Sequence, residues 1–470
     1  MIRPWKLNIE INTSDTTPVY LQIVEGIIEA IKTKRLNQGL LLPSSRVLST
    51  QLKVNRNTVV KALDLLVAEE WLVAKERKGY FISNQLPNQY SADSKKMEKV
   101  ARELEPSKML LSFDDGLPDT KIAPVDELAK AYRQILARKA RWKTLGISDP
   151  RGNNDLRKSI AQMLSLNRGV QFSTEQIFIA RGSQMAAYLV AHCILQKGDI
   201  VAVENPGYKP IWASMKTAGA DILPVPVDEC GIKVSVLEEL LKSNSIKAIY
   251  VTPHHQFPTT VSLSLPRRLK LIELSNRYGF TIIEDDYDHE FHFGIRPILP
   301  IGSLQHIENY VYLGTFSKIV APALRIGFLA TSISLANKVA ELRKIIDGQG
   351  DVIMEQAVYQ LIQDGNIKRH IKRAIIFYKA KRDFFEKLLV KYLGEKVSFI
   401  KPEGGLAFWL VPKVSIDIFE IAKKLEAQGI GIITPDKFSF SAPINGFRIG
   451  YASLSEKQLK EGVIALSKLL

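Results

Sequence analysis

Residues 309–327 read NYVYLGTFSKIVAPALRIG, an apolar stretch followed by polar residues. A short apolar strand, residues 310–313, ends at a glycine. Four polar residues follow the strand: Thr315, Ser317, Lys318 and Arg325. Burial disfavours the charged form of a lysine, so a lysine at the end of a buried strand becomes a nucleophile toward aldehydes. Hydroxyl groups and an arginine beside it suit a phosphate.

An aldehyde and a phosphate together indicate pyridoxal 5'-phosphate (PLP). Lys318 would form the imine with that cofactor. The plainer alternative is a strand followed by a loop with an exposed lysine, and residues elsewhere in the chain must decide between the two.

The overall composition is that of a globular protein with more than one domain. The chain has 470 residues, of which 46% are hydrophobic and 24% charged, so it can bury a large core. Its formal charge of +15 favours a polyanion such as nucleic acid as partner, although a basic, solvated surface explains the charge equally well. Two cysteines do not make a disulfide framework, and no long apolar run indicates a membrane segment. We therefore expect a cytoplasmic protein without a membrane partner.

The N-terminal residues predict three short helices followed by a hairpin. Residues 18–35 carry apolar side chains at helical spacing, and a Pro-Ser-Ser sequence at 43–45 begins a second helix. A third helix starts at Arg56, and two short extended pieces flank Arg77-Lys78-Gly79. Three helices and a basic hairpin indicate a winged helix-turn-helix domain over residues 1–83.

The third helix of such a domain presents its first residues to base edges in the major groove. The wing reaches the DNA backbone or the minor groove. The alternative is a protein-binding helical domain whose basic residues only face solvent. The residues expected to contact DNA are Ser45, Arg46, Arg56, Asn57, Thr58, Lys61, Arg77 and Lys78.

The remainder is expected to form a linker and an α/β domain. Residues 84–111 are polar and lack a sustained apolar period, as is typical of a tether between domains. From residue 112 to residue 470, helical stretches alternate with short apolar strands, which indicates a mainly parallel sheet. A smaller C-terminal α+β subdomain is expected from about residue 365.

Several polar residues lie just past these strands, where ligands bind in open α/β sheets. Gly182, Ser183 and Gln184 open a helix, whose N-terminal N–H groups suit a phosphate. Tyr208 is placed to stack on a pyridine ring. Asp285 would keep the ring nitrogen protonated, and Tyr287 would lie near the ring hydroxyl. Arg448, near the end of the chain, is a candidate clamp for a carboxylate.

Each of these residues also has an ordinary structural explanation. The acidic run 284–286 favours a magnesium site as the rival interpretation, but no phosphate-loop glycine pattern accompanies it. The six features fall at strand ends in the order that one cofactor site needs. We therefore predict a PLP site and no metal.

Two sets of motifs resemble known families. PVYLQI, LPSSRVLSTQL, VNRNTVVKALDLL and KGYFI are similar to the N-terminal domain of the GntR family of bacterial regulators. EDDYDHEF and GTFSKIVAPALRIG, with ENPGY and TPHHQFPT upstream, resemble the fold-type I aminotransferases. Both halves in this order resemble the MocR-type subfamily of GntR regulators.

The resemblance implies PLP on Lys318, the roles given above for Asp285, Tyr287 and Tyr208, and an effector carboxylate on Arg448. It also implies that Ser183, Thr315 and Arg325 hold the phosphate, and that the chain forms a domain-swapped, head-to-tail homodimer.

The chain departs from the family at a few positions. Residues 257–260 read FPTT where aminotransferases usually show NPTG, so the asparagine that contacts the ring oxygen is absent and His255 or Gln256 is its candidate substitute. Ile147 stands where a tyrosine is common, which puts a phosphate contact from a partner subunit in doubt.

Three functions follow from these patterns. The first is a PLP-dependent transcriptional regulator that senses an amino-group or carboxylate ligand, or PLP itself. The second is an active aminotransferase with an appended DNA-binding domain. The third, a regulator that has lost PLP, is disfavoured because Asp285, Tyr287, Lys318 and Arg325 are all present. The effector, the operator and the sign of regulation do not follow from the sequence.

Overall fold

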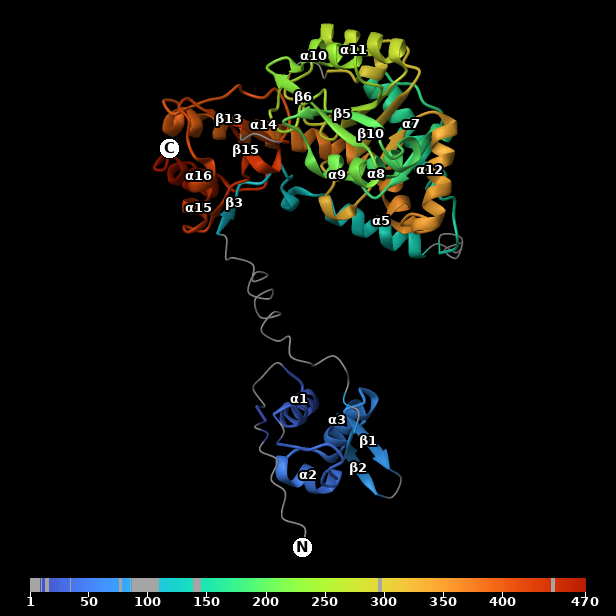
Figure 1. Ribbon diagram of the computed structural model, residues 1–470, viewed down its shortest axis with the longest axis vertical. Coiled ribbons are helices and arrows are strands. Elements are labelled where there is room, and N and C mark those ends of the chain that lie inside the picture. The colour runs from blue at the N-terminus through green and yellow to red at the C-terminus, as the bar shows by residue number, and fades with distance from the viewer. Residues whose placement is uncertain are drawn as a thin grey trace. The chain divides into compact units, whose positions relative to one another are not determined.

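The computed structural model describes residues 9, 11–12, 17–33, 35–75, 78–84, 86, 110–137, 145–294, 298–440 and 444–470. The chain separates into two compact units, Met1–Pro106 and Ser107–Leu470. Figure 1 shows both, and each is described by itself. Most of the predicted linker lies outside the described residues.

The N-terminal unit is a winged helix-turn-helix, as predicted. Its elements are α1 (Val19–Lys32), α2 (Ser45–Leu52), α3 (Arg56–Ala68), β1 (Leu72–Lys75) and β2 (Gly79–Ile82). Ser44 caps α2 by accepting from the N–H of Val47, and Asn55 caps α3 by accepting from the N–H of Asn57. The apolar faces of the helices close on one core that includes Ile27, a residue with no exposed surface.

The second unit is built on an eight-stranded sheet with the order β4-β11-β10-β9-β8-β5-β6-β7. The pairings from β10 through β6 are parallel, which confirms the mainly parallel sheet, whereas β11 is antiparallel to both of its neighbours. The strands are β4 (Ile177–Ala180), β5 (Ile200–Asn205), β6 (Asp221–Asp228), β7 (Gly231–Ile232), β8 (Ile246–Val251), β9 (Thr281–Asp286), β10 (Tyr310–Thr315) and β11 (Gly327–Ala330).

Helices cover both faces of this sheet. Figure 1 shows α10 and α11 across the sheet from α8 and α9. One face packs against α8 (Ser183–Ile194), α9 (Lys209–Thr217) and α12 (Ile333–Ile346). The other packs against α7 (Asn154–Arg168), α10 (Val234–Leu241), α11 (Leu265–Tyr278) and α13 (Val352–Gln363). Helix α5 (Val125–Ala137) lies against α13.

The C-terminal subdomain begins at the long helix α14 (Asn366–Leu393). It contains the sheet β12-β13-β15 and a two-stranded sheet, β14 with β3. Its elements are β12 (Val397–Ser398), β13 (Ala407–Pro412), α15 (Ile418–Glu426), β14 (Ile430–Gly431), β15 (Phe447–Gly450) and α16 (Glu456–Ser467). Strand β3 (Leu111–Ser112) comes from the start of the unit, so the subdomain also contains residues that precede the large sheet.

No helix in the described part of the chain combines the length and the apolar surface that crossing a membrane requires.

A substitution at Phe113 can test whether residues 111–113 belong to the core of the C-terminal subdomain. Its side chain has no exposed surface and packs near Phe385 of α14. Replacement by alanine leaves a cavity, so we expect Phe113→Ala to lower the free energy of unfolding by about 3–5 kcal/mol. Leu110, which is 77% exposed, provides the control. Leu110→Ala should change the free energy of unfolding by less than about 0.5 kcal/mol. Equal losses in denaturant titrations of the two variants would contradict the assignment.

Candidate functional site

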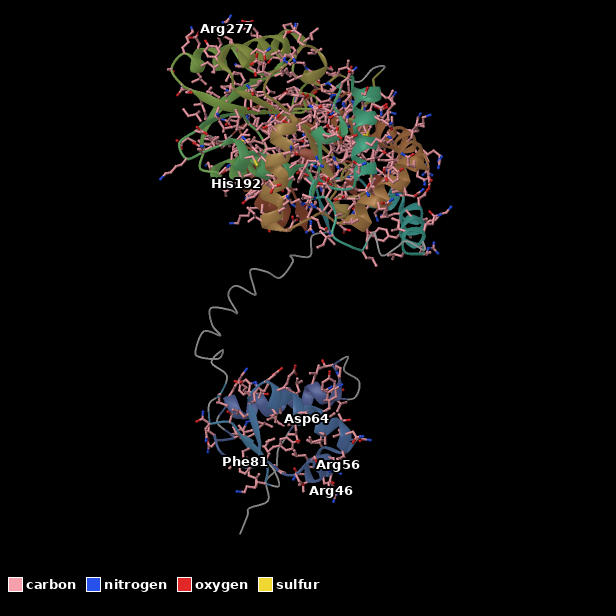
Figure 2. The ribbon with its side chains drawn as sticks, turned by 90° about the vertical axis from the view of Figure 1, so that its right-hand side faces the viewer. Arg46, Arg56, Asp64, Phe81, His192 and Arg277 are labelled. Carbon is pink, nitrogen blue, oxygen red and sulfur yellow. The ribbon has the colours of Figure 1, made fainter. Side chains whose placement is uncertain are left out.

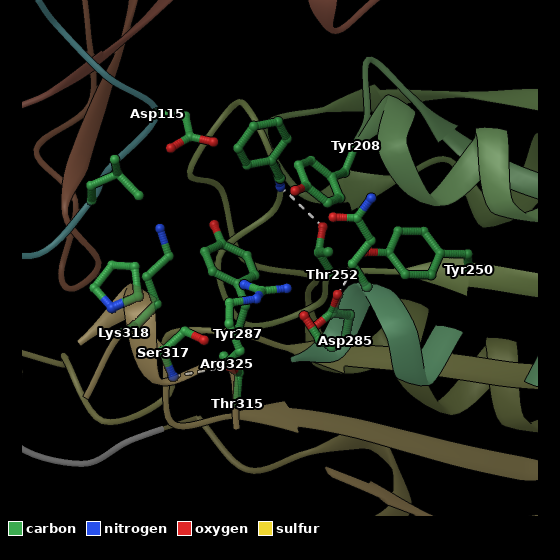
Figure 3. A pocket seen from close by; sticks show the side chains of 15 residues that line it. Asp115, Tyr208, Tyr250, Thr252, Asp285, Tyr287, Thr315, Ser317, Lys318 and Arg325 are labelled. Carbon is green, nitrogen blue, oxygen red and sulfur yellow. Dashed lines mark hydrogen bonds between the residues drawn. The ribbon is translucent and has the colours of Figure 1, made fainter. Parts of the chain in front are cut away.

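A pocket opens at the carboxyl ends of the parallel strands (Figure 3). Nine of the eleven predicted cofactor residues line it: Ser183, Gln184, Tyr208, Asp285, Tyr287, Thr315, Ser317, Lys318 and Arg325. Six lining residues were not predicted: Asp115, Leu117, Tyr250, Thr252, Phe257 and Pro322. Residues from five strands of the large sheet or their following loops, and from the segment after β3, therefore meet in one place.

Asp285 is the buried carboxylate of this pocket. Its Oδ2 accepts a hydrogen bond of 2.8 Å from the hydroxyl of Tyr250. Its Oδ1 is buried and has no hydrogen-bond partner among the described residues. Burial raises the pKa of Asp285 to about 7, against the effect of Tyr250. An unpaired buried oxygen needs a donor, and the protonated nitrogen of a pyridine ring is such a donor.

The neighbouring Asp286 faces the other side of the sheet, because successive side chains of a strand alternate. Its carboxylate accepts from the hydroxyl of Tyr312 at 2.6 Å and lies 3.0 Å from Nδ1 of His289. Ligand atoms of His254, Asp286 and His289 lie within 4.8 Å of one another. Two imidazoles and one carboxylate suit Mg²⁺ poorly, since that ion prefers oxygen ligands. This cluster lies outside the pocket lining and does not support the rival interpretation of a magnesium site.

Lys318 brings its amine into the pocket. It follows β10 by three residues, and its Nζ donates to the backbone oxygen of Gly116 at 2.8 Å. Burial lowers the pKa of Lys318, and the nearby charge of Asp115 opposes that shift. A larger neutral fraction of the amine makes it a better nucleophile toward an aldehyde.

The phosphate end combines a helix N-terminus with hydroxyls and an arginine. Ser183 begins α8, and Gly182 before it has φ = 84°. A Cβ on Gly182 would lie 2.8 Å from Nη2 of Arg325, so the glycine lets the arginine approach the helix. Ser317 Oγ is buried and has no partner within the described part of the chain. A free hydroxyl, an arginine and helix N–H groups are a donor set that suits a phosphate.

Aromatic side chains form the remaining walls. Tyr208 lies edge-on to Phe257, with ring centroids 5.0 Å apart. The hydroxyl of Tyr287 donates to the backbone oxygen of His255 at 3.0 Å. Together with the Asp285 and phosphate ends, these walls fit the ring of PLP.

Two predicted cofactor residues do not line the pocket. His255 turns away from it, and its Nδ1 lies 2.8 Å from Oδ1 of Asp288 in a buried pair. Gly182 acts through its backbone. Arg448, the predicted effector residue, is also outside the lining. Its Nε donates to the backbone oxygen of Asp115 at 2.7 Å.

Among the missed residues, Tyr250 had a signal in the sequence. It is a polar aromatic residue near the end of β8, one strand away from Asp285. Asp115 and Leu117 had none, because they arrive from the start of the unit through β3 rather than from a strand of the large sheet.

Most of the predicted DNA-contacting residues lie on α2 and α3, and Lys78 lies between β1 and β2. Arg46 and Arg56 lie at the same end of the N-terminal unit in Figure 2, and Nε of Arg56 donates to Ser45 Oγ at 3.3 Å. Asn57 and Lys78 are exposed, and Thr58 is partly buried. The ammonium of Lys61 lies 3.9 Å from the ring centroid of Tyr20 on α1. Arg77 lies outside the described residues.

The comparison with known families agrees with this geometry. Residues 106–466 match the family "Aminotransferase class I and II", which is more than half of the chain. The chain belongs to this aminotransferase family. Residues 19–82 match a second family, "Bacterial regulatory proteins, gntR family". The chain therefore joins a GntR-type DNA-binding domain to an aminotransferase domain, as the MocR-type resemblance implied.

Individual relatives of this aminotransferase-family chain include regulators and enzymes. A "Probable rhizopine catabolism regulatory protein MocR" from Rhizobium meliloti is 28% identical, over 96% of this chain and 93% of the relative. The "HTH-type pyridoxine biosynthesis transcriptional regulator PdxR" from Corynebacterium glutamicum is 28% identical, over 97% of this chain and 96% of the relative. Among solved structures, Pyrococcus horikoshii kynurenine aminotransferase in complex with PMP is 28% identical, with a TM-score of 0.73, over 81% of this chain and 94% of that one.

The raised pKa of Asp285 has a consequence for stability in the cofactor-free protein. Its folded pKa, about 7, exceeds the ordinary value of 3.8, so the folded state binds more protons between these pH values. Ionisation of Asp285 should therefore reduce stability as the pH rises from 4 to 7. We expect Asp285→Asn, which cannot ionise, to lose less stability over this range in denaturant titrations. Parallel curves for both proteins would contradict the raised pKa.

Proposed function

We propose that this protein is a PLP-dependent transcriptional regulator whose DNA binding responds to a small amine effector or to PLP itself. The observation that carries the proposal is the presence on one chain of a GntR-type winged helix and a pocket lined by nine of the eleven predicted cofactor residues. An enzyme has no need of a DNA-binding domain. Because operator DNA is its partner, we expect the protein to act in the cytoplasm.

In this proposal PLP supplies an aldehyde that reacts reversibly with primary amines and a ring that accepts electrons. Asp285 holds the ring nitrogen and keeps it protonated. Ser183, Thr315 and Arg325 would hold the phosphate, together with Ser317. Lys318 would supply the amine that binds the aldehyde, and Tyr208, Tyr250 and Phe257 would exclude water from the ring.

Regulation requires that the effector binds one arrangement of the protein better than another. Effector binding in the pocket and DNA binding by the winged helix are then coupled. The effector changes the affinity for DNA by the same factor by which DNA changes the affinity for the effector. We expect a head-to-tail homodimer, which would present two winged helices and therefore read a repeated or palindromic operator.

The second candidate is an active aminotransferase, because the pocket keeps the lysine and the aspartate that such chemistry uses. One feature argues for little turnover. Phe257 lines the pocket at the position where aminotransferases usually have the asparagine that contacts the ring oxygen. Turnover of common amino acids at enzymatic rates would favour this second function.

Lys318 is the residue to test first. Borohydride reduction of the PLP-loaded protein should add the mass of one cofactor less one oxygen to the intact chain, because the imine forms with loss of water and reduction makes the bond to the lysine permanent. Lys318→Ala should abolish this addition, while Lys338→Ala, which removes an exposed lysine, should preserve it. A retained, reducible adduct in Lys318→Ala would show that another amine holds the cofactor.

Arg56 tests the recognition helix. With an operator selected from random duplexes, Arg56→Ala should weaken binding by ~1–3 kcal/mol if the side chain reads a base. Arg277→Ala makes the same charge change on the aminotransferase unit, where the side chain is 56% exposed, and should leave the affinity nearly unchanged. Equal affinities of wild type and Arg56→Ala in fluorescence anisotropy would reject this helix as the reader.

A further inference from the structure

Two buried histidines and an aspartate meet at the carboxyl ends of β8 and β9, outside the lining of the cofactor pocket. His254 lies in the loop after β8, Asp286 ends β9, and His289 follows β9 by three residues. One possible ligand atom from each lies within 4.8 Å of the others. The strands pair in parallel, so the sheet itself brings the two loops to one edge.

The ring of His254 is buried without a polar partner. The residue is 5% exposed, and its ring makes no hydrogen bond or ion pair with any residue in the described ranges. It lies instead beside the ring of His289, with centroids 4.9 Å apart. Burial lowers the pKa of His254 well below its ordinary value, so this imidazole is neutral, the form that binds a metal. A buried polar ring without a partner is costly, and a ligand would offset that cost.

Asp286 and His289 have the spacing of two ligands of one ion. Oδ2 of Asp286 lies 3.0 Å from Nδ1 of His289, yet this nitrogen forms no hydrogen bond of acceptable geometry within the described part of the chain. Zinc bonds of about 2 Å in tetrahedral geometry place neighbouring ligand atoms about 3.3 Å apart. A protonated His289 paired with Asp286 would explain these two residues alone, and would leave His254 unpartnered.

The carboxylate of Asp286 has further features of a metal ligand. Its Oδ1 is buried and has no hydrogen-bond partner among the described residues. Its Oδ2 accepts from the hydroxyl of Tyr312 at 2.6 Å, and such hydrogen bonds orient carboxylates that bind metals.

The charges around the cluster leave room for a cation. Nε of Arg168 lies 3.9 Å from Oδ2 of Asp286, but the guanidinium is also paired with Glu290. It lies over the ring of Tyr312 as well, 5.6 Å from the centroid. Two carboxylates and one guanidinium leave an excess negative charge beside the two imidazoles.

We propose that His254, Asp286 and His289 bind one zinc ion, which joins the loop after β8 to the loop after β9. Two nitrogen ligands favour zinc and related transition metals over magnesium, and the fourth position is open to water. Tyr287, which lines the cofactor pocket, lies between two of the ligands in the chain, so the ion would steady that wall. The sequence alone predicts no metal, because only the pairing of the strands brings His254 to the end of β9.

Zinc titration of the full chain tests this site, which does not depend on the proposed function. The PLP-loaded protein, carrying no affinity tag, is freed of metals with a chelator and titrated with Zn²⁺ in competition with a zinc-binding dye. The wild type should bind one ion per chain, and excess Mg²⁺ should not displace it. His254→Ala and His289→Ala should each lower the zinc affinity at least about tenfold. His306→Ala, which removes an exposed histidine, is the matched control and should leave the affinity unchanged.

Cooperative thermal unfolding shows whether each variant is folded. Where His254→Ala is not, His254→Gln, which keeps a polar side chain of similar size, should show the same loss of zinc affinity. A wild type that binds no zinc, displacement of zinc by Mg²⁺, or equal zinc affinities in the wild type and the folded His254 variant would each overturn the proposal.

Discussion

The burial of the Asp285 carboxylate is the constraint on which the site depends. A buried carboxylate is costly unless its oxygens find donors, and among the described residues the hydroxyl of Tyr250 on the neighbouring strand is the one donor to Asp285. The other oxygen is buried and has no hydrogen-bond partner in the described part of the chain. The parallel pairing of β8 with β9 holds Tyr250 and Asp285 together, so the sheet itself maintains the requirement for a ligand at this point.

Strand alternation explains why three adjacent acidic residues have separate roles. Asp285 points toward the face that α8 covers, with Ile283 two residues earlier on the same face. Glu284 and Asp286 point to the opposite face, where the hydroxyls of Tyr310 and Tyr312 bond them. One face of β9 therefore builds the cofactor pocket while the other builds the support beneath it.

The segment at the start of the second unit connects the two parts of the aminotransferase domain. Its strand β3 and Phe113 belong to the core of the C-terminal subdomain, while the backbone oxygen of Gly116 accepts from Lys318 in the pocket. A ligand in the pocket would touch this segment and the large sheet at once. In the proposed regulator, this is the part of the domain through which effector binding would alter the subdomain.

The sequence by itself determined the winged helix, the parallel sheet and most residues of the pocket. Apolar periodicity and helix caps report local structure directly, and strand ends converge at one edge of a parallel sheet. Only the tertiary structure decided which partners these polar side chains find. His255 lies beside Asp288, and Nε and Nη1 of Arg448 donate to backbone oxygens. It alone brought the segment around Asp115 to the pocket, where the backbone oxygen of Gly116 accepts from Lys318, which is 202 positions away in the chain.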